Sequence, residues 1–398
     1  MSKTFCILPF VHLEARSDSF VAPCCMSQEF YTKDTGEFFS LSKDTLSDVW
    51  NSSSIRNLRT SLLEGKKPTA CAACWKEEEF GKESKRIREN KRWNINHETF
   101  TPERINSENT VCEIKFLDLK LGNTCNLKCR ICSPGSSSNW VKEHKDIYGS
   151  DIVTDIGQKV NADRKQVMQW PDYNENFWTD LNTILPNVEL FEIYGGEPFL
   201  ISRHFQVLQK SIEMGYSKKQ KIHYNTNGTI FPEIAVKEIW PHFEDVDIML
   251  SIDGIGPQFE YQRYPAKWDS VLNNIQRFKN EFSGRTQICL TVSSINVFYL
   301  PEYLEFFQSQ EIPVWLNILY HPEVLSIVNL SSFTKDKISE KINKYTHLNT
   351  DLTSVLNFMN AEGKNLEQEF IHKMKTHDEY RKQNYASVFE EFSNILTL

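Results

Sequence analysis

The segment Asn123-Thr124-Cys125-Asn126-Leu127-Lys128-Cys129-Arg130-Ile131-Cys132 places three cysteines in a C-x3-C-x2-C spacing, directly after a strand-like run. Three thiolates this close in one loop can bind three irons of a cubane iron-sulfur cluster, leaving the fourth iron without a protein ligand. Such an iron is open to another molecule. The alternatives are a zinc site that lacks one ligand, a disulfide with a spare thiol, or small buried hydrophobic residues.

The size and charge of the chain narrow its class. It has 398 residues, with 45 Lys and Arg against 53 Asp and Glu. A single core stops growing near about 250–300 residues, so we expect one large domain plus smaller parts. The mildly acidic balance offers no positive field for a phosphate backbone, so we expect no nucleic-acid partner. No apolar run approaches the roughly 18 residues of a membrane span, so we expect a cytoplasmic protein without a membrane anchor.

Ten cysteines in a chain of this size are better explained by reduced, metal-binding thiols than by a secreted disulfide framework. They are unevenly distributed. Beside the triad, five lie in the first quarter and two stand alone: Cys6, Cys24, Cys25, Cys71 and Cys74, then Cys112 and Cys289. Two metal centres are therefore plausible.

From Cys112 onward, six runs rich in β-forming residues alternate with stretches that can be helical. This pattern is typical of βα units and a parallel sheet. We expect an α/β fold with a partial (β/α)6 TIM-like barrel over residues 111–325, a cysteine-rich region over 1–110 and a helical C-terminal region over 326–398. The predicted strands are 112–121, 189–194, 221–224, 246–252, 287–292 and 314–319; the predicted C-terminal helices are 335–344, 352–360, 366–374 and 385–396.

Polar clusters follow the first four predicted strands. They are the cysteine loop, Gly195-Gly196-Glu197-Pro198, residues 225–228 and residues 251–254. Each cluster alone can be turn chemistry. Because the C-terminal ends of barrel strands form one rim where sites are built, their joint appearance predicts a site there.

The triad, the Gly195–Pro198 segment and the six-unit βα pattern together resemble the radical S-adenosylmethionine superfamily. The resemblance implies that the open iron of a [4Fe-4S] cluster is chelated by the amino and carboxylate groups of S-adenosylmethionine. It implies that the reduced cluster cleaves the sulfonium, and that the resulting 5'-deoxyadenosyl radical abstracts a hydrogen from substrate. An external one-electron reductant such as flavodoxin or ferredoxin is then required.

Several residues are candidates to contact S-adenosylmethionine. Two adjacent glycines let backbone approach a ligand closely, and Glu197 can pair with a cationic amino group. Arg263 can hold the carboxylate, although it can equally be a surface ion pair. Ser251 and Asp253 suit ribose hydroxyls, and Ile131 stands where many family members have an aromatic beside adenine. The full candidate set is Gly195, Gly196, Glu197, Pro198, Asn227, Ser251, Asp253, Arg263 and Ile131.

The N-terminal cysteines resemble half of the SPASM pattern, in the shortened form called a twitch domain, which holds an auxiliary iron-sulfur cluster. The resemblance covers about residues 5–90 and precedes the barrel, whereas the family usually places it after. By motif, Cys6, Cys24, Cys71 and Cys74 would bind a second [4Fe-4S] cluster, with Cys25 as a neighbour. A four-cysteine zinc site is the competing interpretation.

Relatives with this architecture often modify ribosomally made peptides, so a peptide is the first expected substrate, by analogy. The same chemistry on a small metabolite is an alternative, and so is a non-catalytic iron-sulfur electron-transfer or zinc-binding protein. Cys289, on the fifth predicted strand, is a candidate hydrogen donor. A lone cysteine in an apolar strand is more often a packed small residue.

Overall fold

The computed structural model describes residues 4–27, 29–95, 97–101, 113–149, 152–153, 159–160 and 170–396. Cys112 lies outside the described residues. Within the described part, no helix is both long and apolar enough to cross a lipid bilayer.

The main sheet has eight strands and is mostly parallel, in the order β10-β9-β8-β7-β6-β3-β1-β2. Six strands of this sheet, β3 and β6–β10, fall on the six predicted runs, which confirms an α/β fold. Closure of these strands into a partial barrel stays a prediction. The strands are β1 (His12–Ala15), β2 (Val21–Ala22), β3 (Phe116–Leu119), β6 (Leu190–Ile193), β7 (Lys221–Thr226), β8 (Asp245–Ser251), β9 (Arg285–Val292) and β10 (Val314–Ile318); a separate pair joins β4 (Ile152–Val153) and β5 (Lys159–Val160).

Two strands, β1 and β2, come from the cysteine-rich N-terminal segment and were not predicted. Strand β1 pairs in parallel with β3, with Glu14 beside Asp118, and pairs antiparallel with β2. All four residues of β1 are buried. The first cysteine-rich segment therefore contributes directly to the sheet.

Packing divides the chain into two compact units. The first comprises Met1–Thr124, Val153–Tyr224 and Glu233–Val246, and the second comprises Cys125–Ile152, Asn225–Pro232 and Asp247–Leu398. The predicted domain boundaries at 110/111 and 325/326 stay predictions.

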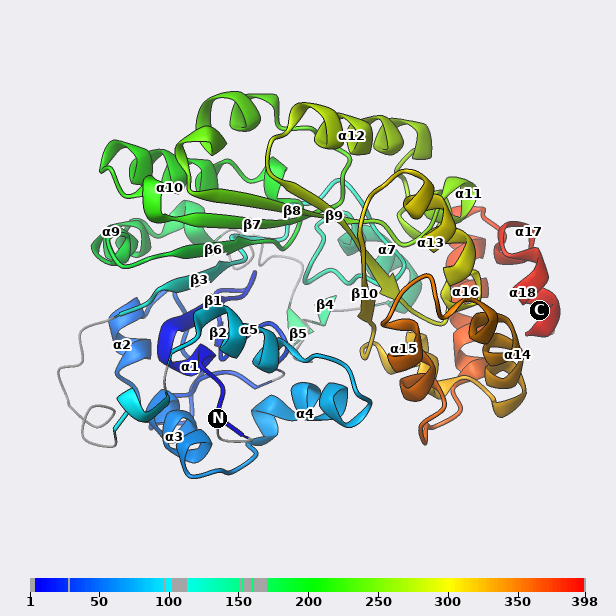
Figure 1. Cartoon of the computed structure of the whole chain (residues 1–398), viewed down its shortest axis with the longest axis horizontal. Helices are drawn as coiled ribbons and strands as arrows, with labels where there is room; N and C mark the ends of the chain where they lie inside the picture. Colours follow the sequence, from blue (N-terminus) through cyan, green and yellow to red (C-terminus); the bar gives the residue numbers. More distant parts are fainter. Residues whose placement is uncertain are drawn as a thin grey trace. The chain divides into compact units, whose positions relative to one another are not determined.

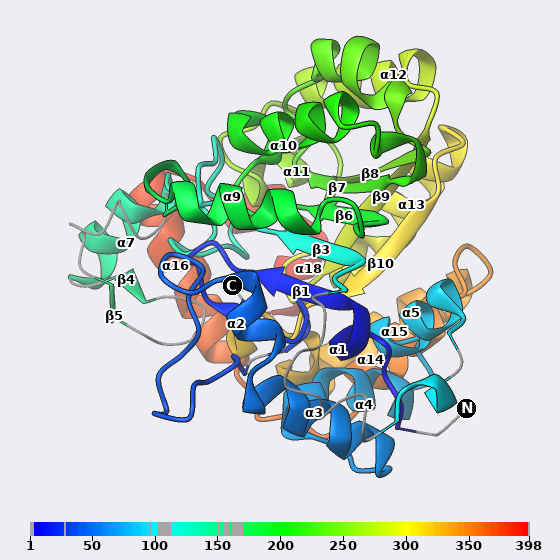
Figure 2. The ribbon, with the colours of Figure 1, turned by 90° about the vertical axis from the view of Figure 1, so that its left-hand side faces the viewer.

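In the first unit, short helices pack around the N-terminal segment. Helix α3 begins after Ser52, whose side chain accepts the Ile55 N–H, and α5 begins after Ser84 in the same way. Helices α2, α3 and α4 gather near α1 and β1 (Figure 1), and α9 and α10 flank β6 and β7 (Figure 2). The helices are α1 (Leu8–Val11), α2 (Leu46–Trp50), α3 (Ser53–Leu63), α4 (Ala72–Glu79), α5 (Lys85–Trp93), α9 (Glu175–Ile184) and α10 (Ser202–Glu213).

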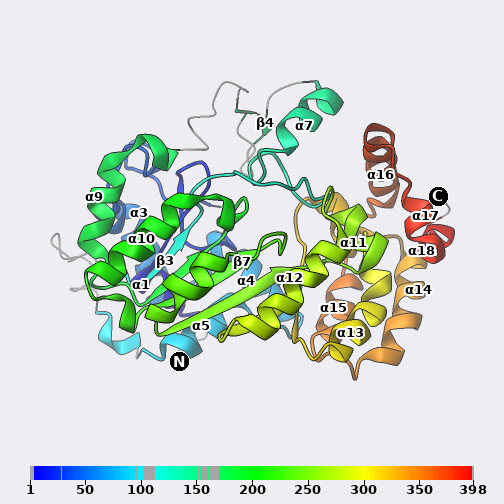
Figure 3. The same cartoon turned by 90° about the horizontal axis from the view of Figure 1, so that it is seen from above.

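In the second unit, α7 (Trp140–Tyr148) follows the cysteine loop, and α11 (Gly256–Gln262), α12 (Trp268–Glu281) and α13 (Leu300–Ser309) connect the last strands. The C-terminal helices gather beside α11 and α13 (Figure 3). They occupy the four stretches predicted to be helical. Their bounds are α14 (Ser332–Ile342), α15 (Leu352–Met359), α16 (Glu367–Arg381), α17 (Tyr385–Val388) and α18 (Glu390–Ile395).

Candidate iron-sulfur sites

The cysteine triad lies in an irregular loop of the second unit. Cys129 is 7% exposed, whereas Cys125 and Cys132 are half-buried. Two side-chain donors face the sulfurs: Asn227 Nδ2 lies 3.9 Å from Cys125 Sγ, and Arg263 Nη1 lies 3.9 Å from Cys129 Sγ. Burial raises the pKa of the Cys129 thiol to about 11, although the nearby Arg263 charge opposes this. Soft thiolates with N–H donors directed at them suit an iron-sulfur cluster.

Arg263 and Asp253 form a buried ion pair rather than a surface one. Arg263 Nε donates to Asp253 Oδ2 at 2.7 Å, and Asp253 Oδ1 accepts the Thr291 N–H at 2.9 Å. Burial lowers the pKa of Arg263, but the charges of Asp253 and Cys129 outweigh it and raise that pKa above its usual range. Both side chains therefore have protein partners. Their predicted contacts with ribose and carboxylate stay predictions.

Four further candidates lie in the same unit. Asn227 donates from Nδ2 to Asn126 Oδ1 at 2.9 Å and accepts the Thr229 N–H on Oδ1 at 2.9 Å. Ser251 and Cys289 are neighbours in the register of β8 and β9, and both are half-buried. Ile131 is also half-buried. Their predicted roles stay predictions.

The glycines at the end of β6 make a close approach to the chain itself. Gly195 and Gly196 have φ values of +88° and +54°. A Cβ atom would lie 2.8 Å from Lys120 Cγ at position 195, and 2.4 Å from the Thr124 carbonyl oxygen at position 196. Both positions therefore require glycine. The prediction that these glycines admit a ligand is not tested by this contact.

Glu197 and Pro198 follow the two glycines and are buried. The Glu197 N–H donates to the Thr124 carbonyl at 2.8 Å, and its Oε1 accepts the Phe199 N–H at 3.3 Å. This carboxylate caps a short turn of helix at Pro198–Leu200. Its pairing with the amino group of S-adenosylmethionine stays a prediction.

Gly196→Ala is expected to destabilise the fold by more than about 1 kcal/mol, because the new Cβ meets backbone at a φ that disfavours it. The backbone that would have to move is that of Thr124, the residue immediately before Cys125. Urea unfolding of the metal-free chain measures the loss. Gly215→Ala is the control, because Gly215 also has positive φ (+76°) but no atom within 4 Å of its Cβ position. Equal losses in both variants would show that the contact with Thr124 contributes nothing.

The four N-terminal cysteines lie near one another in the first unit. Cys6 and Cys74 are each 6% exposed, and Cys24 and Cys71 are half-buried. Burial raises the pKa of the Cys6 thiol, and the nearby Cys71 and Cys74 raise it further. Burial likewise raises the pKa of Cys24, with further contributions from Cys25, Cys74 and Cys6. These mutual effects place the four thiols in one neighbourhood.

A buried tyrosine supports a cluster in this neighbourhood. Tyr31 is 2% exposed, and its hydroxyl has no hydrogen-bond partner among the described residues. Burial raises its pKa, and the charges of Cys24, Cys71 and Cys6 add to this, so the hydroxyl lies near these sulfurs. A thiolate or sulfide sulfur would accept a hydrogen bond from this hydroxyl. No three His, Cys, Asp or Glu side chains of the described chain are grouped in metal-binding geometry, so both ligand sets stay proposals.

The sequence analysis missed a row of titratable residues inside the first unit. Glu14, Asp118, Glu192 and His223 occupy the same register on four neighbouring parallel strands. Lys85 of α5 joins the row, with its Nζ 3.0 Å from Glu192 Oε2 and 3.1 Å from Cys25 Sγ. Within the predicted strands, the signal was a single polar residue between two apolar ones, at Asp118, Glu192 and His223. Cys25 thus lies beside this row, whereas Cys24 lies among the other cysteines.

Tyr194 contacts two carboxyl groups of this row. Its hydroxyl oxygen lies 3.0 Å from Glu14 Oε1 and 2.8 Å from Asp118 Oδ2. A hydroxyl group has a single proton to donate, so Tyr194 can donate a full hydrogen bond to only one of these oxygens at a time. Burial, reinforced by Glu14 and Glu192, raises the pKa of Asp118 well above its usual range. Burial also raises the pKa of Glu14, but the charges of Arg16 and Lys120 outweigh it and lower that pKa. Of these two carboxyl groups, Asp118 is therefore the more readily protonated.

Glu143 of α7 holds the cysteine loop in the second unit. It is 1% exposed, and it accepts from Lys128 Nζ at 2.7 Å, Arg381 Nε at 2.7 Å and His377 Nδ1 at 3.2 Å. Burial raises the pKa of Glu143, but the hydrogen bonds from His377 and Lys128 and the Arg381 charge lower it to about 2.

This depressed pKa predicts a pH-dependent stability. The ionised carboxylate stabilises the fold at pH values above the ordinary glutamate pKa of 4.5, and this contribution is lost as the pH falls towards about 2. Glu143→Gln is expected to cost about 1–2 kcal/mol at pH 7, allowing for screening at the partly exposed Lys128. Urea unfolding between pH 7 and pH 3 should show the two proteins converge as the pH falls. A pH-independent difference would contradict the assignment.

Comparison with known proteins identifies the class of the N-terminal segment. Residues 6–75 match the model of SPASM, an iron-sulfur cluster-binding domain. This confirms the predicted SPASM resemblance and leaves the ligand set and the twitch form untested. No curated protein matches the chain significantly.

Solved structures give weaker similarities. Native anSMEcpe with bound AdoMet and the Cp18Cys peptide is 15% identical, with a TM-score of 0.38, and the match covers 62% of each chain. Streptococcus suis SuiB bound to S-adenosylmethionine is 15% identical, with a TM-score of 0.38, and the match covers 70% of this chain and 59% of SuiB. SuiB bound to the precursor peptide SuiA is 16% identical, with a TM-score of 0.36, and the match covers 84% of this chain and 70% of SuiB. Scores this low carry no conclusion about activity.

Proposed function

We propose that this chain is a radical S-adenosylmethionine enzyme with an auxiliary iron-sulfur cluster, acting on an unactivated C–H bond of its substrate. The observation that carries the proposal is the Cys125–Cys129–Cys132 loop, in which Asn227 and Arg263 direct N–H groups at two of the three sulfurs. When bound there, a [4Fe-4S] cluster and S-adenosylmethionine supply a 5'-deoxyadenosyl radical.

The residues of the chain have distinct tasks in this proposal. The three cysteines hold the cluster, and the donors on their sulfurs stabilise the thiolate charge. Asp253 holds Arg263 in place, with 2.7 Å between Oδ2 and Nε. The residues proposed to contact S-adenosylmethionine are those of the candidate set from Gly195 to Arg263, together with Ile131.

The proposed auxiliary cluster is a [4Fe-4S] cluster held by Cys6, Cys24, Cys71 and Cys74 in a twitch-like domain. The SPASM match over residues 6–75 and the mutual proximity of these thiols support it. With four protein ligands, such a cluster can relay an electron or organise the segment around it. The barrel over residues 111–325 and the helical region over 326–398 complete the proposed domain organisation.

The proposed substrate is a peptide, by analogy with family members of this architecture, and the proposed reductant is flavodoxin or ferredoxin. The same chemistry on a small metabolite is the second candidate. Both share the radical source, so one experiment tests that source before the substrate is known.

Anaerobic reconstitution with iron and sulfide, followed by reduction with dithionite and addition of S-adenosylmethionine, should yield 5'-deoxyadenosine, measured by liquid chromatography and mass spectrometry. Lys337→Met, which changes an exposed lysine of α14, is the control and should retain this product. A protein that holds reducible clusters but forms no 5'-deoxyadenosine would be a non-catalytic electron-transfer protein. Bound zinc in place of iron would favour a zinc-binding protein.

A further inference from the structure

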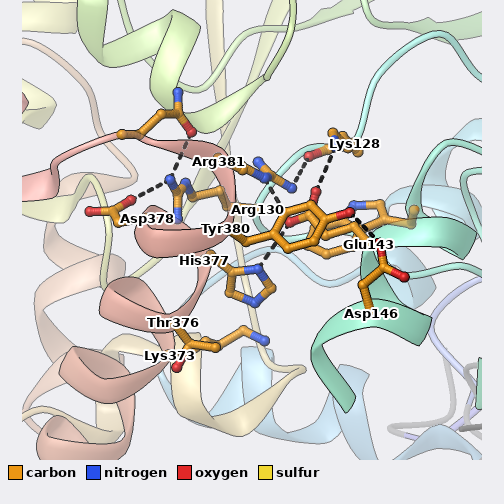
Figure 4. Close-up of polar contacts among 12 residues, drawn as sticks. Lys128, Arg130, Glu143, Asp146, Lys373, Thr376, His377, Asp378, Tyr380 and Arg381 are labelled. Atoms are coloured by element: carbon orange, nitrogen blue, oxygen red, sulfur yellow. Dashed lines mark hydrogen bonds and ion pairs between the residues drawn. The ribbon is translucent and has the colours of Figure 1, made fainter. Parts of the chain in front are cut away.

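The loop between the three cysteines carries two basic residues, and helix α16 engages the loop at both (Figure 4). Arg130 lies between Cys129 and Cys132 and is 2% exposed. Its Nη2 donates to Asp378 Oδ1 at 2.5 Å and to Gln383 Oε1 at 2.9 Å. The guanidinium also lies 3.7 Å from the centre of the Tyr261 ring. Asp378 is in α16, 248 residues further along the chain.

A second residue of α16 holds the same loop one turn later. Arg381 Nη2 donates to the Lys128 carbonyl at 2.8 Å, and Arg381 Nε donates to Glu143 Oε1 at 2.7 Å. Lys128 Nζ pairs with the other carboxylate oxygen of Glu143 at 2.7 Å. Helices α7 and α16 therefore hold Lys128 through its backbone and its side chain together (Figure 4).

The loop backbone has further fixed partners. The Cys129 carbonyl accepts Trp140 Nε1 at 2.9 Å. The Lys128 N–H donates to the Tyr264 carbonyl at 2.8 Å, and the Arg130 N–H donates to the Gln262 carbonyl at 2.9 Å. Backbone direction at Lys128–Arg130 decides where the Cys129 sulfur points. The contacts made by α16 therefore act on a cluster ligand.

Packing alone does not account for these charges. Helix α16 already buries Phe370, Ile371 and Met374. Burying ion pairs such as Arg130–Asp378 and Arg381–Glu143 costs desolvation energy, and apolar residues of similar size often stabilise a fold at least as well. What charged hydrogen bonds with fixed partners add is a defined geometry.

From these contacts we infer that α16 is the positioning element of the cysteine loop, and that Asp378 and Arg381 are positioning residues that fix Cys129 for cluster binding. They act through Arg130 and the Lys128 carbonyl of the loop. The inference rests on the proposed function, because it assigns the loop to a cluster. How firmly the chain holds that cluster, and the reduction potential of the cluster, then depend on α16.

Two full-length variants test the inference. Asp378→Asn weakens the contact with Arg130. Tyr380→Phe is the matched control, because it removes only a 2.7 Å hydrogen bond from α16 to Asp146 of α7 and keeps the ring that lies beside Lys128. In the metal-free chain, alkylation of Cys129 by iodoacetamide, mapped by mass spectrometry, should be about tenfold faster in Asp378→Asn, because the buried thiol reacts when the loop opens. Tyr380→Phe should match wild type.

In the reconstituted chain, Asp378→Asn should shift the reduction potential and the electron paramagnetic resonance signal of the S-adenosylmethionine-responsive cluster, and Asp378→Glu should restore both. Cys74, equally buried in the other unit, is the internal reference for alkylation. A gain at Cys74 as large as that at Cys129 would reflect general unfolding and would overturn the inference.

Wild-type rates and signals in Asp378→Asn would also overturn the inference. Failure of the proposed function gives a different result: wild type itself would bind no S-adenosylmethionine-responsive cluster, while the alkylation comparison would still report on the loop.

Discussion

Replacing Cys125, Cys129 and Cys132 together by Ala is expected to abolish the formation of 5'-deoxyadenosine from S-adenosylmethionine. The reason is that the proposed open-iron cluster loses all of its protein ligands at once. Bound iron should fall from about eight to about four atoms per chain, because each cubane contains four irons. Iron analysis and chromatography of the reaction mixture measure the two effects separately.

The remaining four irons are the control within the same variant, because they belong to the proposed auxiliary cluster. Replacing Cys6, Cys24, Cys71 and Cys74 instead should remove the complementary four. A triple variant that still forms 5'-deoxyadenosine would refute the triad as the radical source. Zinc in place of the remaining iron would refute the auxiliary cluster.

Lys85→Met is expected to destabilise the metal-free protein by about 3–5 kcal/mol, the usual cost of removing one partner of a buried ion pair. Lys85 is 4% exposed, and its ammonium lies 3.0 Å from Glu192 Oε2. Burial raises the pKa of Glu192, but Lys85 is the main group that lowers it, to about 2. Without Lys85, this carboxylate is left buried and less well compensated. Urea unfolding of the metal-free chain measures the loss.

The matched control is Lys337→Met on α14. Lys337 Nζ lies 2.9 Å from Glu340 Oε2, but the lysine side chain is 41% exposed, so the loss should stay within about 1 kcal/mol. Adding Glu192→Leu to Lys85→Met should recover part of the stability, because it removes the stranded charge. Equal losses in Lys85→Met and Lys337→Met would contradict the importance of the buried row.

Strands β3 and β6–β10 and the C-terminal helices could be predicted because each is a local pattern of apolar residues. Strand β1 could not, because His12–Ala15 is short and carries two polar residues, and it becomes recognisable only beside β3. The sequence alone also does not relate Glu14 of this strand to Asp118 and Glu192, with which it is aligned in the sheet. Each looked like an isolated interruption of an apolar run until the strand register brought them together.

The site shows a similar division between local and distant information. The cysteine triad was recognisable from its spacing alone, and so was the SPASM segment. The contact of Arg130 with Asp378 joins residues 248 positions apart and has no local signature. The buried Arg263–Asp253 pair likewise requires the fold, since nothing in the neighbouring sequence distinguishes it from a surface pair.

The tight contact at Gly196 affects how mutational tolerance should be interpreted in this chain. In a saturation mutagenesis screen, every other residue at position 196 should score as deleterious, because its Cβ would meet the Thr124 carbonyl. That intolerance would arise with no cosubstrate present. Contact with S-adenosylmethionine at this position must therefore be established by binding measurements, and not by the failure of substitutions.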